Sequence, residues 1–169
     1  MNGYSKENPG SIGGGGIVRD HKVGLIVAFA DFCGHSSNNL AEIKAVLQST
    51  NLCRSCGFLK DVVKLDSMLI INMINKNMKP PWQISHVLEQ VWSIASIGEF
   101  TSLHYFREEN GIVDQLANLG ERNNNQVIFT EVVSLPRKVR DSLKLEQECL
   151  QNFRFKPRRN HYTTDDVIT

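Results

Sequence analysis

Three carboxylates, Glu42, Asp66 and Asp114, stand where a folded chain could bring them together around a cation. Glu42 comes early in a predicted helix, Asp66 ends an apolar run, and Asp114 lies in a later helical pattern. Hard divalent cations such as Mg²⁺ take oxygen ligands and keep several waters, so a few carboxylates that converge on one end of a sheet suffice. Two such cations about 4 Å apart stabilise the attacking and leaving oxygens when a phosphodiester is displaced in line.

Asn2 occupies a fourth position that such a site would fill with a carboxylate, and its amide is the weak point of the set. An asparagine side chain is neutral and offers one good acceptor, its carbonyl oxygen. We therefore expect hydrolysis by this chain to be strongly impaired.

The hydrophobic pattern predicts the elements that position these residues. Two β-prone runs, 13–19 and 23–32, are separated by a polar turn and predict a hairpin. Helical spacing begins at Asn38, and Gly57 is a plausible stop. The remaining predicted elements are a short first strand at 2–5, a strand at 61–65, a helix capped by Ser67, a helix at 84–95, a strand at 100–106 and a helix at 111–119. This order predicts an α/β fold, a mixed sheet flanked by helices.

Composition limits the class of protein. The 169 residues contain 41% hydrophobic residues, enough for one core and a tail, and the net charge of +1 excludes a strongly basic nucleic-acid binder. Four cysteines and the lack of a secretory start favour an intracellular, reduced compartment. No apolar stretch approaches the roughly 18 residues that a membrane span needs.

The motifs, taken in order, resemble a type 1 ribonuclease H domain of the plant retroelement-derived, reverse-transcriptase-like branch. The resemblance covers about residues 2–120, and its most specific parts are Asn38-Asn39-x-Ala-Glu-x-x-Ala, Leu65-Asp66-Ser67 and Asp114-x-Leu-Ala. It also includes Asn2-Gly-x-Ser-Lys-x-Asn-Pro-Gly, then Gly-Gly-Gly-Ile-Val-Arg-Asp, and later His104-x-x-Arg-Glu-x-Asn110. It implies a mixed five-stranded sheet with an antiparallel hairpin and helices on both faces. The first strand departs from the family, since we expect it to be truncated in this chain.

The resemblance also implies the roles of the four positions. Glu42 and Asp66 would hold a Mg²⁺ on the leaving-group side, and Asp114 the Mg²⁺ that activates water. Asn2 stands where the family's aspartate bridges both metals. The activity implied is endonucleolytic hydrolysis of the RNA strand of RNA/DNA hybrids. In isolation, Glu42 is better explained as an exposed helix residue and Asp66 as a helix cap, and only their conjunction with Asp114 favours the site.

Three asparagines are candidates for nucleic-acid binding by the same resemblance. Asn38 and Asn39 match residues that contact the minor groove of the hybrid, and Asn8 matches a loop residue near the RNA strand. Short amides can bond to the 2′-hydroxyls that this groove displays. Asn38 or Asn39 can equally cap the helix. We expect a monomer with an RNA/DNA hybrid as its partner.

Residues 121–169 form a C-terminal extension beyond the domain at 1–120, and we expect it to be partly disordered. The functional alternative to a hybrid nuclease is a catalytically inactive remnant of a retroelement that binds nucleic acid or another protein. Cys53-Arg-Ser-Cys56 lacks a second cysteine pair, so helix packing explains it better than a metal site does.

Overall fold

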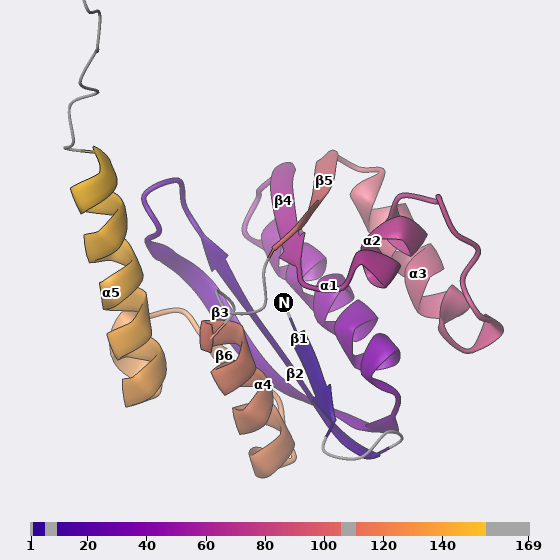
Figure 1. The fold of residues 1–169 in the computed structure, drawn as a ribbon, viewed down its shortest axis with the longest axis horizontal. Helices are drawn as coiled ribbons and strands as arrows, with labels where there is room; N and C mark the ends of the chain where they lie inside the picture. The colour runs from indigo at the N-terminus through magenta and orange to yellow at the C-terminus, as the bar shows by residue number, and fades with distance from the viewer. Residues whose placement is uncertain (1, 6–9, 106–110, 155–169) are drawn as a thin grey trace, which may run out of the picture.

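The computed structural model describes residues 2–5, 10–105 and 111–154 (Figure 1). The strands form two sheets. The first is antiparallel with the order β1-β2-β3-β6, and the second is the parallel pair β4-β5. The strands are β1 (Asn2–Ser5), β2 (Gly10–Arg19), β3 (Leu25–Ser36), β4 (Lys60–Leu65), β5 (Glu99–His104) and β6 (Val127–Phe129). The helices are α1 (Asn38–Ser55), α2 (Met68–Ile74), α3 (Trp82–Ala95), α4 (Gly111–Asn123), the short 3₁₀ helix η2 (Val132–Ser134) and α5 (Arg137–Arg154).

The mixed α/β fold and the hairpin β2–β3 are confirmed, but the strands do not form the single five-stranded sheet that we expected. β1 pairs with β2 over four residues, and no described strand joins β1 to β4. β6 adds a strand that was not predicted, from residues assigned to the C-terminal extension. β1 spans only four residues, so the segment Gly16–Arg19 of β2 has a described partner only in β3.

Four consecutive glycines, Gly13–Gly16, let helices approach the sheet closely on both faces. A Cβ on Gly13 would overlap the carbonyl oxygen of Ala117 in α4, and one on Gly15 would lie 2.5 Å from the amide nitrogen of Ala117. Cβ atoms on Gly14 and Gly16 would approach α1 instead, 3.9 Å from the Cβ of Ala45 and 2.8 Å from the hydroxyl of Ser49, with side chains of β3 closer still. Since side chains alternate between the faces of a strand, the run serves both helices at once. Figure 1 shows the result, with α4 on one side of β1–β2 and α1 on the other.

Two hydrophobic clusters hold the elements together. The first lies between α1, β4, α2 and α3 and includes Val46, Val63, Leu65 and Leu88. The second lies between β3, α4, β6 and α5 and includes Ala28, Leu116, Phe129, Val139 and Leu143. The residues that follow 120 therefore continue on the same core as the hairpin and α4.

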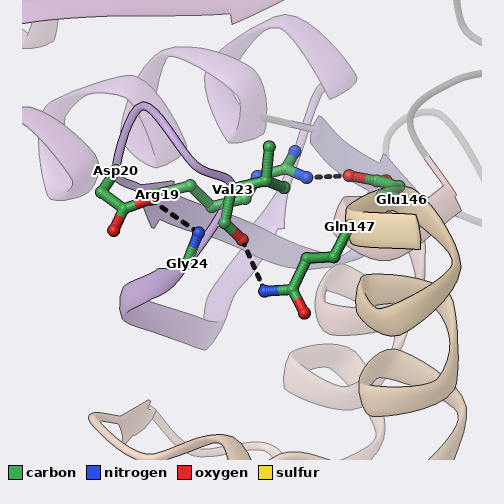
Figure 2. A network of polar contacts seen from close by, with 6 residues as sticks. All are labelled: Arg19, Asp20, Val23, Gly24, Glu146 and Gln147. Atoms are coloured by element: carbon green, nitrogen blue, oxygen red, sulfur yellow. Dashed lines mark hydrogen bonds and ion pairs between the residues drawn. The ribbon is translucent and has the colours of Figure 1, made fainter. Parts of the chain in front are cut away.

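Polar contacts tie α5 to the β2–β3 turn (Figure 2). Arg19 forms an ion pair with Glu146, and the Gln147 side chain donates a hydrogen bond of 3.0 Å to the carbonyl oxygen of Val23. Val23 has a positive φ of 64°. The turn is closed by Asp20, whose carboxylate accepts hydrogen bonds from the backbone N–H groups of Gly24 and Lys22, and these lower its pKa.

Replacing Leu143 with alanine is expected to lower the free energy of unfolding by about 2 to 3 kcal/mol, because the side chain is 1% exposed and its loss leaves a cavity. Leu145→Ala on the same helix is the matched control, since Leu145 is 62% exposed, and we expect it to change stability little. Urea denaturation followed by circular dichroism measures both. Equal stability of the two variants would show that α5 adds nothing to the core.

None of the helices within the described ranges is long and apolar enough to cross a membrane.

Candidate active site

Glu42 lies in the second turn of α1, a helix that is capped at its start and packed into the core around Glu42. The helix begins after Ser37, whose hydroxyl accepts a hydrogen bond of 3.4 Å from the backbone N–H of Leu40. Ala41 and Ala45, on either side of Glu42, are buried. Glu42 itself is half-buried and its Oε2 atom has no solvent exposure. Its carboxylate is therefore held at the edge of the core.

Asp66 follows the last residue of β4 and precedes α2. We considered it as a cap of α2, but the cap is Ser67, whose hydroxyl accepts a hydrogen bond of 3.3 Å from the N–H of Ile70. The Oδ1 atom of Asp66 is buried and has no hydrogen-bond partner within the described part of the chain. An unpartnered buried acceptor costs about 1–3 kcal/mol, so this oxygen calls for a ligand.

Asp114 lies in the first turn of α4 and is half-buried. Asn118, one turn later, donates a hydrogen bond of 2.7 Å to the backbone carbonyl of Asp114. Leu116 and Ala117, two and three residues after Asp114 in α4, lie against Gly15 of β2. Gly15 pairs in turn with Asn2 in β1. Gly15 thus links the two positions: its backbone pairs with that of Asn2, and it packs against the residues of α4 that follow Asp114.

The three carboxylates come from three elements, and the structure does not gather them into a closed cluster. No group of three His, Cys, Asp or Glu side chains within residues 2–5, 10–105 and 111–154 is tight enough to hold a metal ion. The donor chemistry nevertheless suits a hard cation, because all three donors are carboxylates and the free Oδ1 of Asp66 is a buried oxygen. The donor types fit Mg²⁺, and Asp66 is the candidate ligand with a buried oxygen that lacks a partner.

The asparagines at the start of α1 do not cap it, which corrects one of our alternatives. Ser37 supplies the capping hydroxyl, so Asn38 and Asn39 are the first two residues of the helix. The Oδ1 atom of Asn38 is buried without a hydrogen-bond partner among the described residues. Asn38 therefore keeps an acceptor for another ligand. Asn8 lies outside the described residues.

Two of the four cysteines, Cys33 and Cys53, are poor candidates for chemistry. Burial, followed by the charge of Asp61, raises the pKa of Cys53 to about 11. Burial, followed by the charge of Asp31, raises the pKa of Cys33 to about 11. Because the thiolate is the nucleophile and metal ligand, both residues are unreactive near neutral pH. The packing interpretation of Cys53 agrees with its burial in α1.

One charged residue beside Asp66 escaped the sequence analysis. Lys64 is exposed on β4, between the buried residues Val63 and Leu65. The alternation of apolar and polar residues along β4 is the signal that identifies its outward direction. His104, the first residue of the motif that the resemblance includes, ends β5 in register with Leu65 and is exposed.

Comparisons with known proteins agree with this architecture. A family model described as reverse transcriptase-like matches residues 1–120. A search of curated proteins finds no match. Among solved structures, RNase H1 from the halophilic archaeon Halobacterium salinarum has 21% sequence identity and a TM-score of 0.68, covering 72% of this chain and 94% of that one.

Two further solved structures have the same fold. The N-terminal RNase H domain of Rv2228c from Mycobacterium tuberculosis has 22% identity and a TM-score of 0.69, covering 72% of this chain and 90% of that one. LC11-RNase H1, isolated from compost and solved in complex with an RNA/DNA hybrid, has 22% identity and a TM-score of 0.68, covering 73% and 94%. Identities this low show the fold alone.

Proposed function

Because the chain belongs to the reverse transcriptase-like family and has the fold of RNase H1 structures, we propose that it binds RNA/DNA hybrids at an RNase H-like site. Within this proposal, hydrolysis of the RNA strand is strongly impaired by Asn2. LC11-RNase H1 is known in complex with an RNA/DNA hybrid, which supports this choice of ligand.

The observation that carries the proposal is the buried, unpartnered Oδ1 of Asp66. Asp66 lies at the carboxyl end of β4, and β4 pairs in parallel with β5. Ligands of α/β sheets bind outside the carboxyl ends of parallel strands. A carboxylate oxygen left without a partner at this place is therefore explained by a cation and the phosphate that accompanies it.

Glu42, Asp66 and Asp114 would hold the Mg²⁺ ions, because they supply the anionic oxygens that this cation prefers. When bound, two Mg²⁺ ions stabilise the attacking and leaving oxygens of the phosphodiester. Asn2 presents a neutral amide at the fourth position, so the charge of the bridging ligand is missing. Hybrid binding depends less on this charge than cleavage does. The proposal therefore keeps binding of the hybrid and expects its hydrolysis to be impaired.

Asn38 and Asn39 would contact the minor groove of the hybrid. The free, buried Oδ1 of Asn38 supports this role, since a 2′-hydroxyl can donate to it. Recognition would then follow the shape of the groove and its hydroxyls rather than the base sequence.

A short labelled RNA/DNA hybrid is expected to bind at low salt, with an affinity that falls steeply between about 50 and 200 mM salt as condensed counterions are released. Fluorescence anisotropy measures the dissociation constant. Asn38→Ala should weaken binding to the hybrid more than binding to a DNA duplex of the same sequence, because the duplex lacks 2′-hydroxyls.

Asn51→Ala is the matched control for this experiment, because Asn51 lies on the same helix and is exposed near its other end. We expect it to bind like the unmodified chain. Absence of any hybrid binding at low salt would contradict the proposal and favour a domain that contacts other proteins.

A further inference from the structure

An ion pair joins the last turn of α1 to the start of β4, at the ends of these elements away from the candidate site. Its members are Arg54 of α1 and Asp61, the second residue of β4. Nη1 of Arg54 lies 2.7 Å from Oδ1 of Asp61, and the two side chains are only 12% and 7% exposed. A buried pair of this kind is stable only if hydrogen bonds also satisfy the remaining donors and acceptors of both groups.

The turn that follows α1 fixes the position of Arg54. Gly57 has a positive φ of 83°, a conformation that glycine adopts without strain. Its N–H donates to the carbonyl oxygen of Arg54 and the N–H of Phe58 donates to that of Cys53, at 3.0 and 2.9 Å, the Schellman pattern of a helix end. The carbonyl oxygen of Phe58 then accepts a hydrogen bond of 2.7 Å from Nη1 of Arg54. Phe58 and Asp61 therefore hold the guanidinium through the same nitrogen.

The other polar atoms of the pair lack partners. Nε and Nη2 of Arg54 and Oδ2 of Asp61 are buried and have no hydrogen-bond partner within the described part of the chain. Buried polar groups in folded proteins are nearly always hydrogen-bonded, either to protein or to ordered water. A guanidinium only donates, whereas a carboxylate only accepts. A ligand that completes this pair must therefore accept from Arg54 and donate to Asp61.

This requirement selects the chemical class of the ligand. An anion would accept from Arg54 but would be repelled by the charge of Asp61, and a metal ion would be repelled by the guanidinium. An apolar group would satisfy neither side chain. A neutral molecule that both donates and accepts meets the requirement, and water is the smallest of these.

We propose that the pair Arg54–Asp61 binds an ordered water molecule, which accepts from Nε or Nη2 of Arg54 and donates to Oδ2 of Asp61. The water is then an internal part of the junction between α1 and β4. It takes no part in nucleic-acid binding.

A high-resolution crystal structure of the full chain tests the assignment directly. We expect a density peak about 2.5–3.2 Å from Oδ2 of Asp61 and from Nε or Nη2 of Arg54. A guanidinium that has turned to pair with both oxygens of Asp61, with no peak beside it, would overturn the assignment. An unchanged pair without a peak would overturn it as well.

The double variant Arg54→Met with Asp61→Leu removes both charges and replaces them with apolar side chains of similar volume. Because such replacements of buried ion pairs often leave stability unchanged or higher, we expect a folded protein. Its crystal structure should lack the peak. A peak that persists would show that other groups hold the water, and the role of Arg54 and Asp61 would fall.

Proton NMR of the unmodified chain tests the same water in solution and needs no variant. The Nε–H of Arg54 should give a nuclear Overhauser effect to the water resonance with the sign of a long-lived bound molecule. Arg137 is the matched control, because its Nε also lies near an aspartate, 3.8 Å from Asp141, but its side chain is 88% exposed. It should give no such effect. If the two arginines behave alike, the ordered water is disproved, while the proposed function stands.

Discussion

Replacing Asn2 with aspartate is expected to raise Mg²⁺-dependent cleavage of the RNA strand in a hybrid by at least about a hundredfold. Loss of a residue that only supports a metal ligand commonly costs 10- to 100-fold in metal affinity or activity, so restoring a charged ligand should gain at least as much. The added charge would compensate the repulsion between two cations at a position where the amide is neutral. Gel analysis of a labelled hybrid, with and without Mg²⁺, measures the gain.

The control for this gain is the double variant Asn2→Asp with Asp66→Asn, which should remain inactive because the second carboxylate is lost. Cleavage that appears in the double variant would come from a contaminating nuclease. Measurable Mg²⁺-dependent cleavage by the unmodified chain, with no increase on Asn2→Asp, would contradict the role given to Asn2.

Gly13→Ala is expected to destabilise the fold by an amount on the order of 4 kcal/mol, the upper end of single-substitution effects. The added methyl group would overlap the backbone of α4 at Ala117 and Glu121, and backbone atoms cannot turn aside as a flexible side chain can. Either α4 moves away from β2 or the strand bends, and both changes disturb close packing. Urea denaturation gives the free energy of unfolding.

Gly111→Ala is the matched substitution, because no described atom lies within 4 Å of the position that its Cβ would take. Gly111 begins α4, where alanine is the better helix former, so stability should be unchanged or slightly higher. A Gly13→Ala variant as stable as Gly111→Ala would show that α4 does not rest on the glycine run.

The sequence predicts the local elements well because their signals are local. The period of Leu40, Ile43 and Val46 places α1, and the apolar run before Asp66 places β4. The capping residue of α1 is harder to identify, since Ser37 precedes two asparagines that are also good caps. Only the observed hydrogen bond to Leu40 decides between them.

Pairing between distant segments could not be predicted in the same way. Pairing of β1 with β4 depends on contacts between residues far apart in the chain. The resemblance implied one sheet that contains both strands, and the structure places them in two. The part played by α5 has a weak signal, the spacing of Leu135, Val139 and Leu143 at steps of four, inside an otherwise polar segment. The role of the glycine run, with helices packed on both faces of the sheet, also depends on segments far apart in the chain.

Because the strands form two separate sheets, α1 connects them by packing against both. Ala45 of this helix lies against Gly14 of β2, and its neighbour Val46 belongs to the cluster that contains Val63 of β4. Asn2 lies on one sheet and Asp66 at the end of a strand in the other. The separation of these two positions is therefore set through adjacent side chains of one helix, with no ladder of described backbone hydrogen bonds between the sheets. Core packing responds to a change of a single methylene. A substitution in α1 that changes this packing would therefore also change the distance between Asn2 and Asp66.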